Sequence, residues 1–330
     1  MEVILTIIAI LVISHLLMFL GKKIKIPGVV MLIIAGLVFN IGFLEKTFIL
    51  GNQQSLITLG TIGLFVLMFL AGLEISWKKL YEEKRNSAFI AFFASLLPFA
   101  LGLIIFYMLG FPLLTSAVVG ITMAITAEAT KARVLFDLKK LKTKLGTTMM
   151  GAGMIDDLIG LALFLIVAFI FSSWSNESLI TIGAIAAFFL GVISHKAFRS
   201  KEGKTFFEKT LMFLFVPFFF ISIGIHFDPR SLTLNPLILL LLVSIAISGK
   251  IVGVLLTKHF TKFKNKQLLL IGWAMYSRGA VELALALIAF NIGLLNAELY
   301  SGIILMALIT TLIFPFIITR MIKKNPKIMN

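Results

Sequence analysis

Long apolar runs fill most of this chain and limit its possible folds more than any other feature. Eleven runs of roughly 17–25 residues follow one another along its 330 residues, separated by short polar stretches. With 60% hydrophobic and 14% charged residues, the chain is too apolar for a soluble core. We therefore expect an all-α, polytopic membrane protein. The runs cover residues 3–20, 27–43, 55–76, 87–109, 114–136, 146–171, 178–196, 206–226, 235–257, 267–291 and 298–320.

The basic residues predict how these helices are oriented in the bilayer. Lys and Arg concentrate in the stretches after the odd-numbered runs, whereas the stretches after the even-numbered runs hold only Lys46 and Arg230. Basic loops stay in the cytoplasm, so we expect the N-terminus outside and the C-terminus inside. The net charge of +15 therefore reflects basic cytoplasmic loops and does not indicate that the protein binds nucleic acid. Lys22 and Lys23 follow the first run, which indicates a retained helix and not a signal peptide.

An internal repeat relates two parts of the chain. The stretch GVVMLIIAGLVF at 28–39 matches GAIAAFFLGVIS at 183–194 in the spacing of two glycines. FLAGLEIS at 69–76 matches ISIGIHFD at 221–228 in one glycine. Repeats of five helices enter the membrane from opposite faces, which is the inverted repeat of many secondary transporters. Chance similarity between apolar helices is the alternative.

The repeat gives the domain organisation that we expect. Residues 1–330 form a single transmembrane domain without a soluble regulatory domain. An extra helix at 3–20 precedes repeat one at 27–171 and repeat two at 178–320.

Charged residues lie inside the fifth and tenth runs, which correspond in the repeat. ITAEATKARVLFDL carries Glu128 and Lys131, and SRGAVELALAL carries Arg278 and Glu282, with Thr126 aligned to Arg278. Inverted-repeat transporters cross two discontinuous helices near the midplane, and side-chain charges can neutralise their exposed ends. We therefore expect crossed, discontinuous helices here, with these four charged residues at the breaks. The alternative for Arg278 and Glu282 is a simple i, i+4 ion pair.

Two adjacent acids, Asp156 and Asp157, interrupt the sixth run in GAGMIDDLIG. Ionisable residues within a membrane are costly and commonly functional. Neighbouring side chains on a helix point about 100° apart, so the two acids address different partners. Lys250, the only basic residue of the ninth run, is expected to pair with one of them. The other then faces the polar residues of the fifth run. The alternative for the two acids is an outward-facing, water-lined helix without transport, and the alternative for Lys250 is a purely structural ion pair.

The second carboxylate has the properties of an ion-exchange site. Removal from water favours its protonated form, and an alkali cation neutralises the same charge. Thr126 and Thr130 could supply hydroxyl ligands to that cation. Competition between proton and cation, combined with alternating access, is antiport. This predicts a secondary transporter that is not an enzyme and needs no cofactor. An intramembrane aspartyl protease, or a sensor with the same fold, is a remote alternative.

Several motifs together resemble those of sodium/proton antiporters in the cation:proton antiporter superfamily, in the NapA- and Kef-like branch. The resemblance implies a scaffold, a mobile core that moves like an elevator, and a homodimer. It implies that Asp157 binds the cation and the proton, and that Asp156 pairs with Lys250 as in electrogenic members. It places Thr126 at the unwound crossing. The motifs are IPGVVMLIIAGLVF, GLFVLMFLAGLEISWKKL, TAEATKARVLFDL, GAGMIDDLIG, FFFISIGIHFDP, GK at 249–250 and SRGAVELALA.

The chain departs from that family in three places. SSWSNES directly joins two runs between which the family commonly has two further helices. Glu128 and Lys131 stand where many relatives have small or hydroxyl residues, and Glu282 follows Arg278-Gly279 after two intervening residues. We expect an electrogenic antiporter of a prokaryotic cytoplasmic membrane that expels one Na⁺ or Li⁺ for two protons and serves pH homeostasis. A potassium/proton antiporter, or a Kef-like potassium efflux protein, is the alternative.

Overall fold

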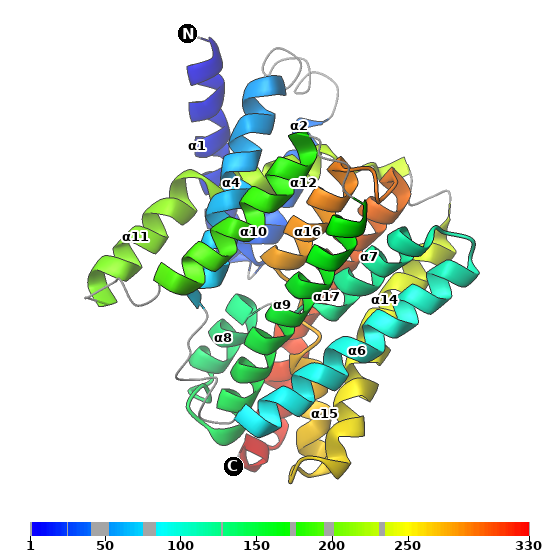
Figure 1. Cartoon of the computed structure of the whole chain (residues 1–330). Coiled ribbons are helices and arrows are strands. Elements are labelled where there is room, and N and C mark those ends of the chain that lie inside the picture. The colour runs from blue at the N-terminus through cyan, green and yellow to red at the C-terminus, as the bar shows by residue number, and fades with distance from the viewer. Residues whose placement is uncertain are drawn as a thin grey trace. The chain divides into compact units, whose positions relative to one another are not determined.

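The computed structural model is all-helical in the part of the chain that it describes, which confirms the predicted class (Figure 1). No strand occurs among those residues. The helices form two compact units, and each unit combines segments from both halves of the chain. The described residues are 2–24, 26–40, 53–74, 84–126, 128–171, 176–194, 201–230 and 235–329.

Unit 1 comprises Met1–Ile75 and Leu179–Asp228. In it, α12 packs against α2 and α4, so segments far apart in the sequence share one core. Its helices are α1 (Glu2–Lys23), α2 (Gly28–Phe39), α4 (Gln53–Glu74), α10 (Asn176–Ser194), α11 (Lys201–Leu214) and α12 (Val216–Ile225).

Unit 2 comprises Ser76–Ser178 and Pro229–Asn330. Its α6 packs against α7, α9 and α14. The helices are α6 (Lys84–Met108), α7 (Leu113–Ala124), α8 (Glu128–Asp137), α9 (Lys144–Phe171), α14 (Pro236–Leu256), α15 (Asn265–Ala274), α16 (Ala280–Asn291) and α17 (Ala297–Lys324), with short 3₁₀ helices η2 (Thr257–His259) and η3 (Pro326–Met329).

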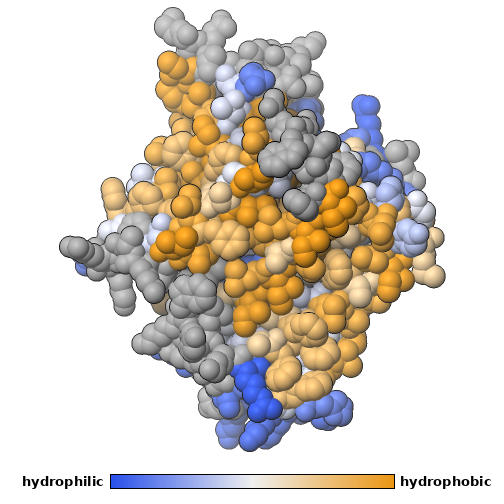
Figure 2. Space-filling view, viewed as in Figure 1, coloured by the Kyte–Doolittle hydropathy of each residue, from blue (hydrophilic) through white to orange (hydrophobic). Residues whose placement is uncertain are grey.

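Length and composition allow seven helices of the described part to cross a membrane, and four further apolar helices are shorter. Each of the eleven predicted runs overlaps one of these helices. Large apolar side chains such as Met108, Ile193 and Phe206 are 80%, 73% and 74% exposed, and apolar residues cover much of the face seen in Figure 2. Such a surface is suited to lipid, so the chain is a multi-pass membrane protein.

One predicted helix differs in the structure. The run at 206–226 was expected to be continuous, but α11 ends at Leu214 and α12 begins at Val216. Pro217 lies in the first turn of α12. Proline has no N–H for the preceding turn and its ring crowds that turn, so a helix commonly restarts there.

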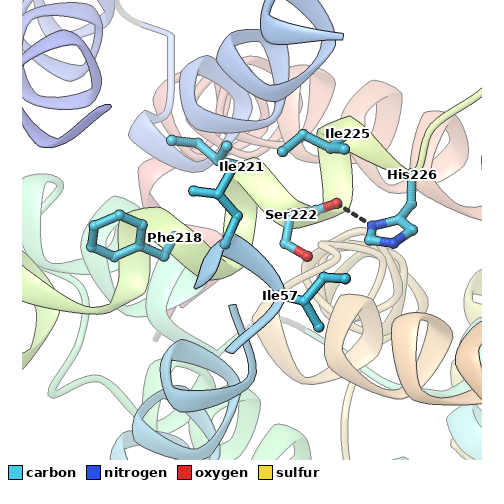
Figure 3. A pocket seen from close by; sticks show the side chains of 7 residues that line it. Ile57, Phe218, Ile221, Ser222, Ile225 and His226 are labelled. Atoms are coloured by element: carbon cyan, nitrogen blue, oxygen red, sulfur yellow. Dashed lines mark hydrogen bonds between the residues drawn. The ribbon is translucent and has the colours of Figure 1, made fainter. Parts of the chain in front are cut away.

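A small pocket lies between α4 and α12 within unit 1 (Figure 3). Ile57, Phe218 and Ile221 line it with apolar atoms. Its polar groups come from Ser222 and His226, and Nδ1 of His226 donates to the Ser222 carbonyl at 2.7 Å. That bond lies within the last turn of α12, so the ring stays close to the end of its own helix.

Candidate functional site

Two predicted helices of unit 2 are interrupted, and their breaks contact each other. The first break lies between α7 and α8, and the second lies between α15 and α16. Helix α7 ends before Ile125, whose backbone is extended (φ −76°, ψ 149°). Helix α16 begins after Gly279, which is also extended (φ −148°, ψ −167°). The Thr126 hydroxyl in the first break lies 2.9 Å from the carbonyl of Met275 at the end of α15. The predicted discontinuous helices are therefore present, and the two breaks contact each other through Thr126 and Met275.

Arg278, in the second break, lies at the C-terminal end of α7. Its Nη1 donates to the carbonyls of Thr122 at 3.1 Å and Ile125 at 2.5 Å, and its Nη2 donates to that of Met123 at 2.7 Å. The last carbonyls of a helix lack partners within it and carry partial negative charge. Glu282, in the first turn of α16, lies 3.7 Å from Arg278 Nε. Arg278 and Glu282 therefore make an i, i+4 contact beside the break, and their role in compensating the helix ends stays a prediction.

Asp156 of α9 and Lys250 of α14 form a fully buried ion pair. Nζ of Lys250 lies 3.0 Å and 2.9 Å from the two carboxylate oxygens, and both side chains are 0% exposed. The Thr126 hydroxyl lies 2.5 Å from Asp156 Oδ2, and the Ser95 hydroxyl donates to Oδ1. Nζ of Lys250 also donates to the Ala124 carbonyl and lies 3.0 Å from Thr126 Oγ1. The pair therefore occupies the C-terminal end of α7.

Additional hydrogen bonds decide whether a buried ion pair can be tolerated. Removing two charges from water costs several kcal/mol per ion, and their attraction offsets this only when their remaining polar positions are also satisfied. Here Ser95 and Thr126 complete the shell of Asp156, while the α7 end completes that of Lys250. Sequence reasoning missed Ser95, because its only signal was one hydroxyl in an apolar run.

Asp157 is buried, with 8% of its side chain exposed. Gly153 precedes it by four residues and Gly160 follows it by three, so all three lie on one face of α9. A side chain on Gly153 would collide with Glu128, and one on Gly160 would collide with Ile125. That face of α9 is therefore directed at the break between α7 and α8.

Glu128 and Lys131 form a second buried ion pair at the start of α8. Nζ of Lys131 lies 2.7 Å from Glu128 Oε1, with 0% and 7% of the two side chains exposed. Nζ also donates to the Met149 carbonyl of α9 at 2.8 Å and lies 3.7 Å from Met275 Sδ at the end of α15. An acid thus lies in the first turn of α8 and a cation near the C-terminal end of α15, as the helix dipoles favour. Thr130 is half-buried beside them.

All the candidate site residues predicted from the sequence lie in unit 2. One contact differs from the expectation. Thr126 was expected to serve the carboxylate that does not pair with lysine, whereas its hydroxyl lies on Asp156, the partner of Lys250. The Thr126 hydroxyl in the first break contacts Asp156, Lys250 and the Met275 carbonyl of the second break at the same time.

Comparison with known proteins agrees with this architecture. Residues 7–182 and 161–324 match the family described as sodium/hydrogen exchanger, transmembrane. The two pieces overlap around the junction of α9 and α10, where we expect two helices of the family to be missing. The antiporter MjNhaP1 of Methanocaldococcus jannaschii has a similar structure, with a TM-score of 0.68 and 17% identity over 98% of each chain.

Two curated relatives illustrate the similarity in sequence. The Na⁺/H⁺-K⁺ antiporter GerN of Bacillus cereus is 26% identical over an alignment of 355 positions that covers 90% of each chain. The Na⁺/H⁺ antiporter of Enterococcus hirae is 23% identical over an alignment of 376 positions that covers 92% of this chain and 94% of the relative.

Proposed function

The chain belongs to the sodium/hydrogen exchanger family, and we propose that Asp157, beside the Asp156–Lys250 ion pair, is where its cation and protons exchange. Members of this family are transporters and not enzymes. The observation that carries the proposal is a buried carboxylate at the α7–α8 break, next to a fully buried acid–lysine pair. A carboxylate removed from water binds a proton readily, and a monovalent cation neutralises the same charge.

The ion pair supports electrogenic exchange. When the cation occupies Asp157, Lys250 releases its proton and its bond with Asp156 opens. Protons that enter from outside then displace the cation from Asp157 and re-form the Asp156–Lys250 bond. Two protons move inward for each Na⁺ expelled, so one net charge crosses per cycle. The membrane potential contributes about 2.3 kcal/mol per 100 mV for that charge.

Sodium is the cation that we propose, with lithium as a second substrate. The relatives are named as Na⁺/H⁺ antiporters, and the name of GerN adds K⁺. Potassium/proton exchange is therefore the second candidate. All three ions take carboxylate, hydroxyl and carbonyl oxygens, and they differ in the cavity that they need.

The two compact units support an elevator-like movement. Every predicted site residue belongs to unit 2, so this unit can carry the ion as one body while unit 1 serves as the scaffold. We further propose a homodimer in a prokaryotic cytoplasmic membrane. Its N-terminus is outside and its C-terminus is cytoplasmic, because the basic residues alternate between loops. Its role is pH homeostasis.

Currents from purified protein on a solid-supported membrane test this function. Li⁺, Na⁺ and K⁺ are applied at several pH values, and the order of responses identifies the cation. We expect Asp157→Asn to abolish the current and the dye-reported proton flux. Asp137→Asn removes an acid on α8 that is 54% exposed and is the matched control, with currents like those of the unaltered protein. Proton flux unchanged in Asp157→Asn would refute the proposal.

A further inference from the structure

The Glu128–Lys131 ion pair occupies space that is open only because residue 153 is glycine. A Cβ on Gly153 would overlap both Glu128 Oε1 and Lys131 Nζ. Nζ of Lys131 also donates to the Met149 carbonyl, one turn before Gly153 on the same helix. In a helix, the side chain four residues later stands over such a carbonyl. The missing side chain at 153 therefore lets the lysine reach α9.

This ion pair lies one helical turn from Asp157. Gly153 and Asp157 are four residues apart on α9, and Cβ positions with that spacing are about 5–6 Å apart. Since the Glu128 carboxylate fills the Cβ position of Gly153, its charge is within a similar distance of the Asp157 side chain. Glu128, Lys131 and Asp157 are all buried, so bulk water screens these charges little.

The buried charges of unit 2 are unequal in number. Among the described residues, four acids and three bases are buried, so their formal sum is 3 − 4 = −1. This sum counts Lys250 as protonated, and one proton on Asp157 then neutralises it. The acids are Glu128, Asp156, Asp157 and Glu282, and the bases are Lys131, Lys250 and Arg278.

We propose that the Glu128–Lys131 ion pair determines the charge of the ion that the site accepts. This inference rests on the proposed function and adds a specificity-determining pair to it. Lys131 cancels the charge of Glu128 beside Asp157, so within this cluster of three residues only the Asp157 charge is left for one monovalent cation or one proton to neutralise. Removing only one member changes the sum, whereas removing both restores it.

Three variants test the role of the ion pair. For each, the apparent Na⁺ affinity is measured from supported-membrane currents at fixed pH. Glu128→Gln leaves the Lys131 charge near Asp157 and is expected to weaken the affinity by roughly ten- to a hundredfold. Glu128→Gln/Lys131→Met restores the formal sum and is expected to return it to within about threefold of the unaltered protein. The control Asp137→Asn makes the same charge change on the same helix at an exposed pair with Arg133. Solvent and salt screen that pair, so the affinity stays unchanged.

Two results would overturn the inference. One is an unaltered affinity in Glu128→Gln, and the other is a folded double variant that binds Na⁺ as weakly as Glu128→Gln. Size-exclusion profiles and thermal unfolding in detergent establish folding. If Glu128→Gln does not fold, Lys131→Met replaces it, because it leaves the Glu128 charge unbalanced beside Asp157 and is expected to strengthen the affinity. An unaltered affinity in Lys131→Met then overturns the inference. Asp157→Asn is assayed in parallel. Persistent transport in that variant contradicts the proposed function, whereas the Glu128 variants contradict only the role of the pair.

Discussion

Gly36 of α2 and Gly224 of α12 meet backbone to backbone. A Cβ on either residue would lie 2.8 Å from the Cα of the other and would collide with a carbonyl of the opposite helix. Gly72 of α4 and Gly191 of α10 repeat this arrangement, since a Cβ on each would collide with the carbonyl three residues before the other. The sequence repeat aligns α2 with α10 and α4 with α12, so the two contacts are counterparts. Packing thus supports the repeat independently of the sequence match.

The close approach predicts that Gly36→Ala destabilises unit 1. The added methyl group would overlap the Ile221 carbonyl, which cannot rotate away. Overpacking of this kind costs about 1–3 kcal/mol, so we expect a lower thermal unfolding temperature in detergent. Gly28→Ala is the control on the same helix, because its Cβ would lie 3.4 Å from the flexible Met18 side chain. Equal unfolding temperatures for the two variants would contradict the prediction.

Lys250→Met is expected to abolish charge translocation. The substitution keeps the length of the side chain but leaves Asp156 with only the hydroxyls of Ser95 and Thr126. Breaking a buried ion pair costs about 3–5 kcal/mol, and without the Lys250 ammonium the second proton of the cycle has no carrier. Supported-membrane currents should vanish while electroneutral Na⁺-driven proton flux, followed by dye, persists. Lys258→Met alters an exposed lysine just after α14 and serves as the control. An unaltered current in Lys250→Met would rule out the pairing role.

The helices and their buried charges could be predicted from the sequence because both are local properties of it. Apolar runs predict spans through their length, and a lone buried lysine requires an acid wherever the chain folds. The hydroxyl of Ser95 is different, since it reaches Asp156 across 61 residues of sequence. Which acid Lys250 contacts also depends on how α9 is rotated, and only the resemblance to a known family indicated Asp156.

The pairing of Glu128 with Lys131 is likewise a three-dimensional result. Spacing of i, i+3 permits the ion pair on any helix. What places it beside Asp157 is the glycine at 153, on another helix. Nothing in the spacing along the chain connects these positions. The break at Phe215 could have been predicted from the sequence, because Pro217 lies within a predicted helix.

Thr126→Val is expected to impair transport, and Thr126→Ser to preserve it. Valine has nearly the same shape but removes the hydroxyl that lies 2.5 Å from Asp156 and 2.9 Å from the Met275 carbonyl. Leaving buried polar atoms without this partner costs about 1–3 kcal/mol, so both stability and maximal current should fall. Unfolding temperature and Na⁺-dependent current are measured on the three proteins. If Thr126→Ser fails as badly as Thr126→Val, the methyl group matters and the hydroxyl does not.

Arg278→Gln is expected to destabilise the end of α7. The guanidinium is 1% exposed and donates to three carbonyls there, and glutamine has neither the reach nor the charge to replace it. Loss of charge-assisted hydrogen bonds at a buried helix end should cost about 2–4 kcal/mol. Hydrogen exchange resolved by mass spectrometry should show that the backbone amides of α7 exchange faster in the variant than in the unaltered protein. The exchange of α17 should stay the same in both proteins. Arg133→Gln, at a side chain that is 74% exposed, should leave α7 unchanged. Unaltered exchange in Arg278→Gln would show that other groups hold this helix end.

Gly153→Ala tests whether the missing side chain admits the Glu128–Lys131 ion pair. In the unaltered protein the new methyl group would displace the Glu128 carboxylate, at a cost of about 1–3 kcal/mol. In a Glu128→Ala/Lys131→Ala background the same methyl group meets open space and should cost little. The difference between the two effects, from thermal unfolding in detergent, is the coupling energy, and contacting residues typically show about 0.5–3 kcal/mol. Gly160→Ala, whose new methyl group would first meet the Ile125 side chain, should show no such dependence on the background. A coupling energy of zero for Gly153→Ala would mean that the ion pair does not need the glycine.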